Sequence, residues 1–327
     1  MMRTCPARRV FIAGALTSAF ASTVPTVRAQ TTKPIRLVVP FTPGGTTDIV
    51  ARAIAPKLAL ALGQTVVIEN KPGAGGSLGA AEVARAEPDG LTLLMGHIGT
   101  LAVNPSIYPK LAYDPIKSFA PVAWVVRVPN VLVVHAAAPV KTVAQFIEWA
   151  RSKPGKLSYS SGGNGSAAHI TFEYFKLRTK VFMLHIPYRG TAPSITDLIA
   201  GQVDATFTGG PAVMPHIKSG RLPALAVSSK ERVAVLPDVP TLAESGYPGF
   251  EADQWYGVVA PAGTPPALVA RLNAEINKLL LLPEVQQQLA VEGATPTPST
   301  PQAFGALIAR EIPRWAEVVK AGNVRAD

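Results

Sequence analysis

Short apolar, β-branched runs alternate along this chain with segments whose apolar residues recur every three to four positions. The alternation predicts an α/β fold with mostly parallel strands buried on both faces. The clearest helical patterns start near Val50 and Leu268, and a last one covers 304–315. Pro56 and Pro313 fall inside such patterns and predict a kink or a restart. The predicted strands lie at 35–39, 65–69, 92–95, 131–135, 157–160, 181–185, 205–207, 224–227 and 257–260.

A glycine-rich loop, PFTPGGTTD at residues 40–48, joins the first predicted strand to the first helix. A helix N-terminus carries unpaired backbone N–H groups and a partial positive charge, so it is a ready site for an anion. Gly44 and Gly45 remove the Cβ atoms that would keep a ligand from those groups. The alternative interpretation is a tight turn in which Thr46 or Asp48 caps the helix.

The same arrangement recurs about 120 residues later. A strand candidate is followed by GGNGS at 162–166 and then by a helical pattern to residue 177. Roughly 300 residues suggest two domains rather than one. If each loop belongs to a different domain, two helix N-termini would face each other across a cleft and clamp a carboxylate or phosphate.

Three side chains near these loops have more than one interpretation. Ser166 and His169 fall on one helical face, so they are a nucleophile pair, two hydrogen-bond donors to a ligand, or an N-cap with a packed histidine. For Asp48 we favour the helix cap over a contact with a ligand amino group or a water.

Sequence signatures of other chemistries are missing. Residues 72–80, PGAGGSLGA, lack the third glycine of a dinucleotide loop because Leu78 stands there, so we interpret them as a loop leading into a helix. No Walker A sequence or GxSxG elbow is present, and the five histidines lack zinc-site spacing. We therefore expect no cofactor, no metal and no enzymatic activity.

The first 29 residues have the features of an export signal: Arg8 and Arg9 precede an apolar run from 10 to 24, and cleavage is expected near Ala29. Twin-arginine and general secretory export both remain open. Removing this segment takes four of the 31 Lys and Arg and no acid, so the net charge falls from +10 to +6. The basic residues are scattered, which argues against nucleic acid as a partner. Cys5 is the only cysteine and precedes the apolar run, so a lipid anchor is not expected.

Motifs in order along the whole mature chain resemble the extracytoplasmic receptors of tripartite tricarboxylate transporters, also called Bug receptors. They include PIRLVVPFTPGGTTDIVAR (34–52), LGQTVVIENKPGAGGSLGA (62–80), ARAEPDGLTLLMG (84–96), YDPIKSFAPVAWV (113–125), KPGKLSYSSGGNGSAAHI (153–170), HIPYRGTAPSITDLIAGQVDATF (185–207), PHIKSGRLPALAV (215–227), LPDVPTLAESGYPGFEADQWYGVVAPAGTP (236–265) and FGALIAREIPRWAEVV (304–319).

The resemblance implies a two-lobed periplasmic binding fold of type II, in which each lobe is a twisted, mostly parallel sheet flanked by helices. Lobe 1 would comprise 30–128 and 252–327, and lobe 2 would comprise 129–251. The chain would cross between lobes near 125–130 and 250–255.

The resemblance also implies the site and its partners. The ligand would be a small carboxylate, held between the two loops and then delivered to an integral-membrane permease by a monomeric periplasmic receptor. Alternatives are a sensing receptor and, less favoured, a periplasmic enzyme that uses Ser166 and His169. Segments 97–100 and 208–211 would meet the far end of the ligand. The implied site residues are Phe41, Thr42, Gly45, Thr46, Asp48, His97, Gly99, Thr100, Asn164, Gly165, Ser166, His169, Thr208 and Gly209.

Overall fold

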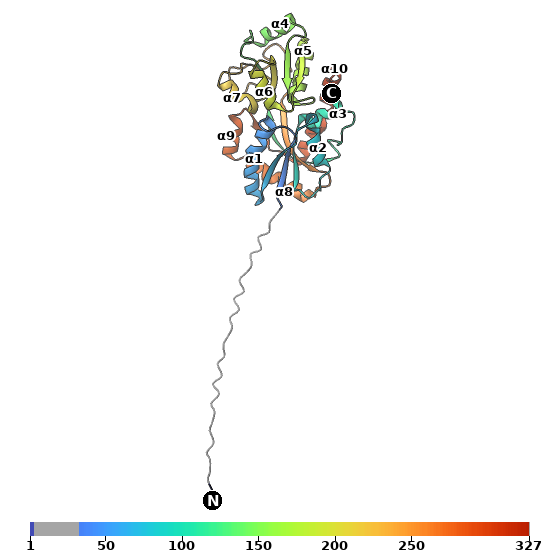
Figure 1. Ribbon diagram of the computed structural model, residues 1–327, viewed down its shortest axis with the longest axis vertical. Coiled ribbons are helices and arrows are strands. Elements are labelled where there is room, and N and C mark those ends of the chain that lie inside the picture. The colour runs from blue at the N-terminus through green and yellow to red at the C-terminus, as the bar shows by residue number, and fades with distance from the viewer. Residues whose placement is uncertain (3–32, 327) are drawn as a thin grey trace. The chain divides into compact units, whose positions relative to one another are not determined.

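Two β-sheets, each flanked by helices, organise the chain (Figure 1). The structure is a computed structural model that describes residues 1–2 and 33–326. The predicted export signal therefore lies almost wholly outside the described residues. The first sheet contains β1 (Ile35–Val39), β2 (Val66–Asn70), β3 (Thr92–His97), β4 (Phe119–Val128), β10 (Gln254–Pro261) and β11 (Thr295–Pro296). The second contains β5 (Asn130–Val134), β6 (Ser158–Ser161), β7 (Leu184–Pro187), β8 (Ala205–Gly209) and β9 (Ala224–Val227).

Both sheets are mixed, which corrects the expectation of mostly parallel strands. The first sheet has the order β11-β4-β10-β3-β1-β2, and only the pairs of β1 with β2 and β3 are parallel. The second has the order β7-β6-β8-β5-β9, and the pairs of β5 with β8 and β9 are antiparallel. The antiparallel pairs arise where β4, β5 and β10 carry the chain between the sheets, a route that does not use a βαβ crossover.

The helices surround the sheets in two groups. In Figure 1, α4 to α7 lie around the second sheet, while α1, α2 and α8 lie around the first. The helices are α1 (Thr46–Leu62), α2 (Ser77–Ala84), α3 (Asn104–Ile107), α4 (Val143–Ser152), α5 (Ala167–Thr179), α6 (Thr191–Ile199), α7 (Gly210–Lys218), α8 (Pro266–Leu280), α9 (Pro283–Ala290) and α10 (Pro301–Ala321), with the short turns η1 (Ala74–Gly76) and η2 (Gly99–Val103).

The two prolines inside predicted helices do not end those helices. Pro56 lies inside α1 and Pro313 inside α10, and both helices continue past them. The ten residues of β4 are a strand that the pattern did not reveal, because Pro121 and Arg127 interrupt its apolar run. All nine strands that were predicted overlap an observed strand, and their ends differ from the observed ends by up to three residues.

The core follows the alternation of side chains along the strands. Leu37 and Val39 of β1 pack with α1 and α8, whereas Val38, between them, faces the cluster on the other side. That second cluster continues into the other half of the molecule, where Phe172 and Phe175 of α5 pack on the second sheet. The described residues from Lys33 onward accordingly form one compact unit.

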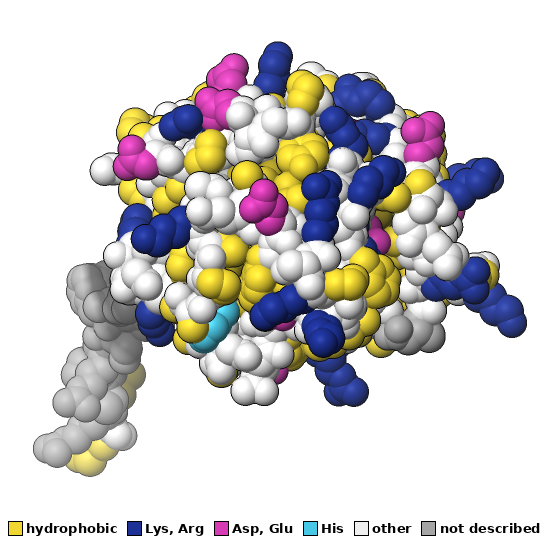
Figure 2. All heavy atoms as spheres, turned by 90° about the horizontal axis from the view of Figure 1, so that it is seen from above, with side chains coloured by type: hydrophobic (Ala, Val, Ile, Leu, Met, Phe, Trp, Pro, Cys, Tyr) yellow, Lys and Arg dark blue, Asp and Glu magenta, His cyan; other side chains and the backbone are white. Residues whose placement is uncertain are grey.

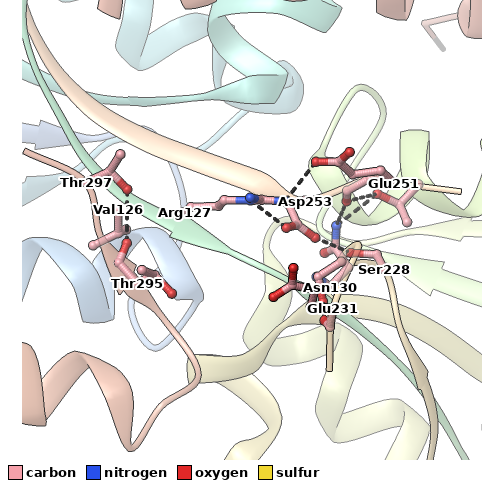
Figure 3. A network of polar contacts seen from close by, with 12 residues as sticks. Val126, Arg127, Asn130, Ser228, Glu231, Glu251, Asp253, Thr295 and Thr297 are labelled. Carbon is pink, nitrogen blue, oxygen red and sulfur yellow. Dashed lines mark hydrogen bonds and ion pairs between the residues drawn. The ribbon is translucent and has the colours of Figure 1, made fainter. Parts of the chain in front are cut away.

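The chain passes between the sheets at two adjacent places. It leaves the first sheet between Val128 and Asn130 and returns between β9 and Gln254. A polar network joins the two passages (Figure 3). Arg127 Nε donates to Asp253 Oδ2 at 2.7 Å, and the Ser228 hydroxyl donates to Asp253 Oδ1 at 2.9 Å. We call this set, with Asn130 and Glu251, the hinge network.

Candidate ligand-binding cleft

The first glycine loop is braced from within by Asp48. The carboxylate is buried and accepts hydrogen bonds from the Gly44 N–H at 2.9 Å, from Arg52 Nε at 2.9 Å and from Asn70 Nδ2 at 3.0 Å. Burial disfavours the ionised carboxylate, but these donors outweigh it, and the pKa of Asp48 is lowered. Asp48 therefore shapes the loop before α1, whereas no side chain caps the start of α1 itself.

Four helices begin beside this loop at glycines that provide no capping side chain. Their N-cap residues are Gly45 for α1, Gly76 for α2, Gly190 for α6 and Gly209 for α7. In contrast, α4, α5 and α10 are capped by the hydroxyls of Thr142, Ser166 and Thr300. Helix starts without side-chain caps keep their first N–H groups for another acceptor.

The glycine starts lie against one another because the two halves of the molecule meet there. A Cβ placed on Gly44 would lie 3.6 Å from that of Ala192, and one on Gly209 would lie 2.8 Å from Thr46 Oγ. A Cβ on Gly190 would lie 1.9 Å from Thr42 Oγ, so only glycine fits. The starts of α6 and α7, from the second sheet's half, therefore face the start of α1.

The second loop meets the first sheet's half through η1 and α3. Tyr108 Oη donates to the Asn164 carbonyl at 3.2 Å, and Asn104 Nδ2 donates to the Gly75 carbonyl at 3.1 Å. A Cβ on Gly75 would lie 2.1 Å from the Asn164 oxygen. Gly165 has a φ of +79°, a conformation that favours glycine, and it faces the Asn104 side chain.

A cleft of about 610 Å³ lies between these loops. From the first sheet's half it is lined by Phe41, by 72–76, by Leu78 and by Tyr108. From the second half it is lined by 162–164 and 187–189. Arg189 is the one charged residue among the described lining residues, and no acidic side chain is among them. This is a suitable setting for a small anion.

Two buried hydroxyls beside the cleft lack hydrogen-bond partners among the described residues. They are Thr42 Oγ and Thr46 Oγ. The Thr46 hydroxyl lies near that of Tyr256, where it offsets part of the rise that burial produces in the tyrosine pKa, but it makes no hydrogen bond of normal geometry. An unpaired buried hydroxyl is unfavourable, so each is a candidate contact for a bound molecule.

His97 lies buried behind Phe41, which lines the cleft. Its Nδ1 accepts the Thr100 N–H at 3.1 Å, and its ring lies 4.6 Å from that of Phe41, centroid to centroid. Burial lowers the pKa of His97 to about 4, so the ring is neutral at pH 7 and carries its proton on Nε2. Gly99 lies between this ring and the Gly165 carbonyl, with no room for a Cβ. Thr100, fully buried, fixes the turn.

Ser166 and His169 do not form a proton-transfer pair. Ser166 Oγ accepts the His169 backbone N–H at 3.4 Å, and His169 Nδ1 accepts the Gly165 N–H at 3.2 Å. The imidazole stacks on that of His185 at 3.8 Å. Burial, followed by the charges of His185 and Lys176, lowers the pKa of His169 to about 2. Both side chains therefore hold the second loop in shape, and Thr208 is buried in β8 next to Gly209.

A family model described as "Tripartite tricarboxylate transporter family receptor" matches residues 50–324. BugT of Bordetella pertussis is 42% identical over 289 residues, 88% of this chain and 89% of that protein. The chain belongs to this receptor family.

Solved structures of family-like proteins share the whole fold. The periplasmic binding protein BugD is 39% identical, with a TM-score of 0.86 over 89% of this chain and 98% of that one. R. palustris Rpa4515 with adipate is 39% identical, with a TM-score of 0.87 over 89% and 97%. MatC from Rhodopseudomonas palustris with bound malate is 38% identical, with a TM-score of 0.84 over 88% and 98%.

Membership in the receptor family confirms the predicted α/β two-lobed periplasmic binding fold and the function as a solute-binding receptor. The homologues are receptors rather than enzymes, and the family implies a small-molecule ligand and membrane transporter partners. Within the described residues, none of the helices is both long and apolar enough to cross a bilayer.

Two segments that line the cleft were not predicted to do so from the sequence. Residues 72–78 were interpreted as a loop with backbone glycines, and Arg189 was not assigned a role in the cleft. The signal was present in both cases, since each segment places glycine directly before a helix, as the two recognised loops do. Asn104 and Tyr108 carried no such signal, because each bonds to a loop residue that is distant in the sequence, Asn104 to Gly75 in its own half and Tyr108 to Asn164 in the other.

Proposed function

We propose that this receptor captures a small carboxylate in the cleft between the two loops and delivers it to a tripartite-type membrane transporter. The observation that carries the proposal is that four uncapped, glycine-started helices begin beside the first loop, next to a cleft whose described lining has one cation and no acid. Backbone N–H groups at helix starts stabilise an anion without needing an ion pair.

The predicted ligand contacts come from both loops. Thr42 and Thr46 would donate their unpaired hydroxyls from the first loop. Asn164 would contribute its backbone N–H from the second, where Gly165 shapes the turn because its N–H is held by His169, while His97 would offer Nε2–H from behind Phe41. Adipate and malate, the ligands of two relatives of known structure, are both dicarboxylates. We therefore expect a dicarboxylate of similar size to bind this protein.

Capture would close one lobe on the other. The proposed lobes are 30–128 with 252–327, and 129–251, and the hinge network lies where the chain passes between them. Because ligand contacts come from both lobes, binding would shift the population toward the closed form. Small-angle scattering with and without ligand tests this, and an unchanged envelope would argue against closure.

The proposal includes export and a monomeric state. The segment 1–29 would direct the chain to the periplasm and be removed near Ala29. N-terminal mass spectrometry of the periplasmic fraction would give Gln30 as the first residue if this is right. Sedimentation would give a single species near the monomer mass. On the face in Figure 2, more Lys and Arg than Asp and Glu side chains are visible, and a positive field of this kind favours anionic small molecules.

A thermal-shift screen against mono-, di- and tricarboxylates, aromatic acids and amino acids tests the ligand class. A ligand at 100 times its Kd stabilises the folded state by about 2.7 kcal/mol, a shift of several degrees. A response confined to carboxylates supports the proposal. The proposal would be contradicted if no carboxylate raised the melting temperature and mass spectrometry found no small molecule retained from expression.

A further inference from the structure

The segment that closes the outer end of the cleft has a fixed backbone and one free charged side chain. Pro187 ends β7 in register with Ser161, and the Tyr188 N–H donates to the Ser161 carbonyl at 3.0 Å. Tyr188 Oη donates to Asp197 Oδ2 at 2.6 Å. On the other side of Arg189, Gly190 has a φ of +140° and packs on Thr42 of the opposite half. The position of the Arg189 backbone is therefore set from both directions.

The Arg189 side chain itself is exposed and makes no hydrogen bond or ion pair within the described part of the chain. Asp197, on the helix α6 that follows Arg189, already accepts a hydrogen bond from Tyr188. By comparison Arg36, Arg52 and Arg127 each form an ion pair. Arg189 is thus an unneutralised guanidinium at the rim of a cleft that has no other described charge.

We infer that Arg189 binds the second carboxylate of a dicarboxylate whose first carboxylate sits at the helix starts. The inference rests on the proposed function and deepens it by naming the residue that would bind the outer charge of the expected dicarboxylate. The N–H groups at the helix starts and the Thr42 and Thr46 hydroxyls can hold one carboxylate, and among the described lining residues only Arg189 carries a charge that could neutralise a second. A guanidinium presents paired donors that match a carboxylate in a bidentate geometry.

Because Arg189 is solvent-exposed, its contribution should be moderate and sensitive to salt. A charge-assisted hydrogen bond at such a position corresponds to about a ten-fold change in Kd. Screening by salt should reduce the difference between a dianion and a monoanion of equal length.

The test compares each diacid with its own monomethyl ester, so that length is constant and only the outer charge changes. Calorimetric titrations would use succinate, glutarate and adipate with the purified, ligand-free exported protein. Wild type should bind the best diacid about ten-fold more tightly than its monoester. Arg189→Gln should lose this preference, because its affinity for the diacid falls by more than its affinity for the monoester, and Arg189→Lys should retain part of it.

Arg85→Gln is the matched control, because Arg85 is also exposed and lies outside the cleft. It should behave as wild type. If Arg189→Gln keeps the full preference for the diacid, the inference is wrong while the proposed function stands. If wild type binds monoesters and diacids equally, the inference is also wrong. If it binds neither, the proposed function fails first.

Discussion

The cleft and the hinge network are both polar regions where the two halves of the molecule meet, but they differ in how their polar groups are paired. In the hinge network, Asn130 Nδ2 donates to the Ala252 carbonyl at 2.7 Å and to Thr171 Oγ at 3.0 Å, and Gln254 donates to Asn130 Oδ1. Both oxygens of Asp253 are also bonded (Figure 3). In the cleft, Thr42 and Thr46 keep unpaired hydroxyls.

The contrast indicates that the hinge network contributes to stability and the cleft to ligand binding. A buried network with every partner in place makes one arrangement of the chain more stable than its alternatives. A buried site with unpaired donors is less stable alone and gains most when a ligand supplies the acceptors. In the proposed closure, the hinge network would fix where the two halves move, and a ligand in the cleft would determine which state they occupy.

Removing polar groups from the hinge network should give the largest effect, on stability. Asn130→Leu keeps the volume but removes the acceptor of Gln254 Nε2 and leaves the Ala252 carbonyl with only the 3.5 Å contact from Thr171 Oγ. Each unpaired group costs about 1–3 kcal/mol, so unfolding free energy should fall by about 3–4 kcal/mol. Urea denaturation followed by circular dichroism measures it. If the unfolding free energy fell by less than about 1 kcal/mol, the paired groups of the hinge network would not be more important for stability than the unpaired groups of the cleft.

Blocking the contact between the two halves should give the next largest effect, on binding. Gly75→Ala places a methyl group 2.1 Å from the Asn164 carbonyl across the cleft, so the closed form should become rare and affinity should fall by about 100-fold. Gly63→Ala is the control: its φ of +64° resembles the +59° of Gly75, but nothing lies within 4 Å. Both variants carry the same backbone strain, of about 1 kcal/mol.

Calorimetric titration with the ligand found by screening would compare the two glycine variants. Equal affinity in Gly75→Ala and Gly63→Ala would mean that closure does not require this contact.

The pattern of the sequence predicted most of the fold because the strands of both halves follow simple rules of burial and alternation. It failed at β4, where Pro121 and Arg127 break the apolar run because this strand lies between β10 and the short β11 near the edge of the sheet. It also overestimated parallel pairing, since strand direction depends on how the chain passes between the sheets, which local pattern does not record.

The candidate site divides in the same way. Two loops were recognisable because glycine followed by a helical pattern has a local signature, and their residues line the cleft or lie beside it. Tyr108 and Asn104 were not recognisable, because each contacts the cleft only through the approach of segments more than 25 residues away. Which of these residues touch ligand remains a prediction.

The neutral histidines beside the cleft should make stability depend on pH. The folded pKa values of His97 and His169, about 4 and about 2, lie below the ordinary value of 6.5. Between these limits the unfolded chain binds more protons, so stability falls as pH decreases from 6.5, by about 1.4 kcal/mol per unit for each histidine. His169→Asn should roughly halve this slope in urea titrations from pH 7 to 4.5. An unchanged slope would mean that His169 is not held neutral.

The smallest effect should come from the unpaired hydroxyl at the start of α1, and it should separate binding from stability. Thr46→Val replaces the hydroxyl with a methyl group of similar size, so no folded-state hydrogen bond is lost and unfolding free energy should change by less than about 0.5 kcal/mol. Affinity for the carboxylate should fall by about ten-fold, because one donor to the anion disappears. Thr142→Val is the contrasting variant, since that hydroxyl caps α4 and its loss should reduce stability by about 1 kcal/mol without changing affinity. If Thr46→Val instead destabilises the free protein as Thr142→Val does, the Thr46 hydroxyl stabilises the folded chain and is not available to bind a ligand at the start of α1.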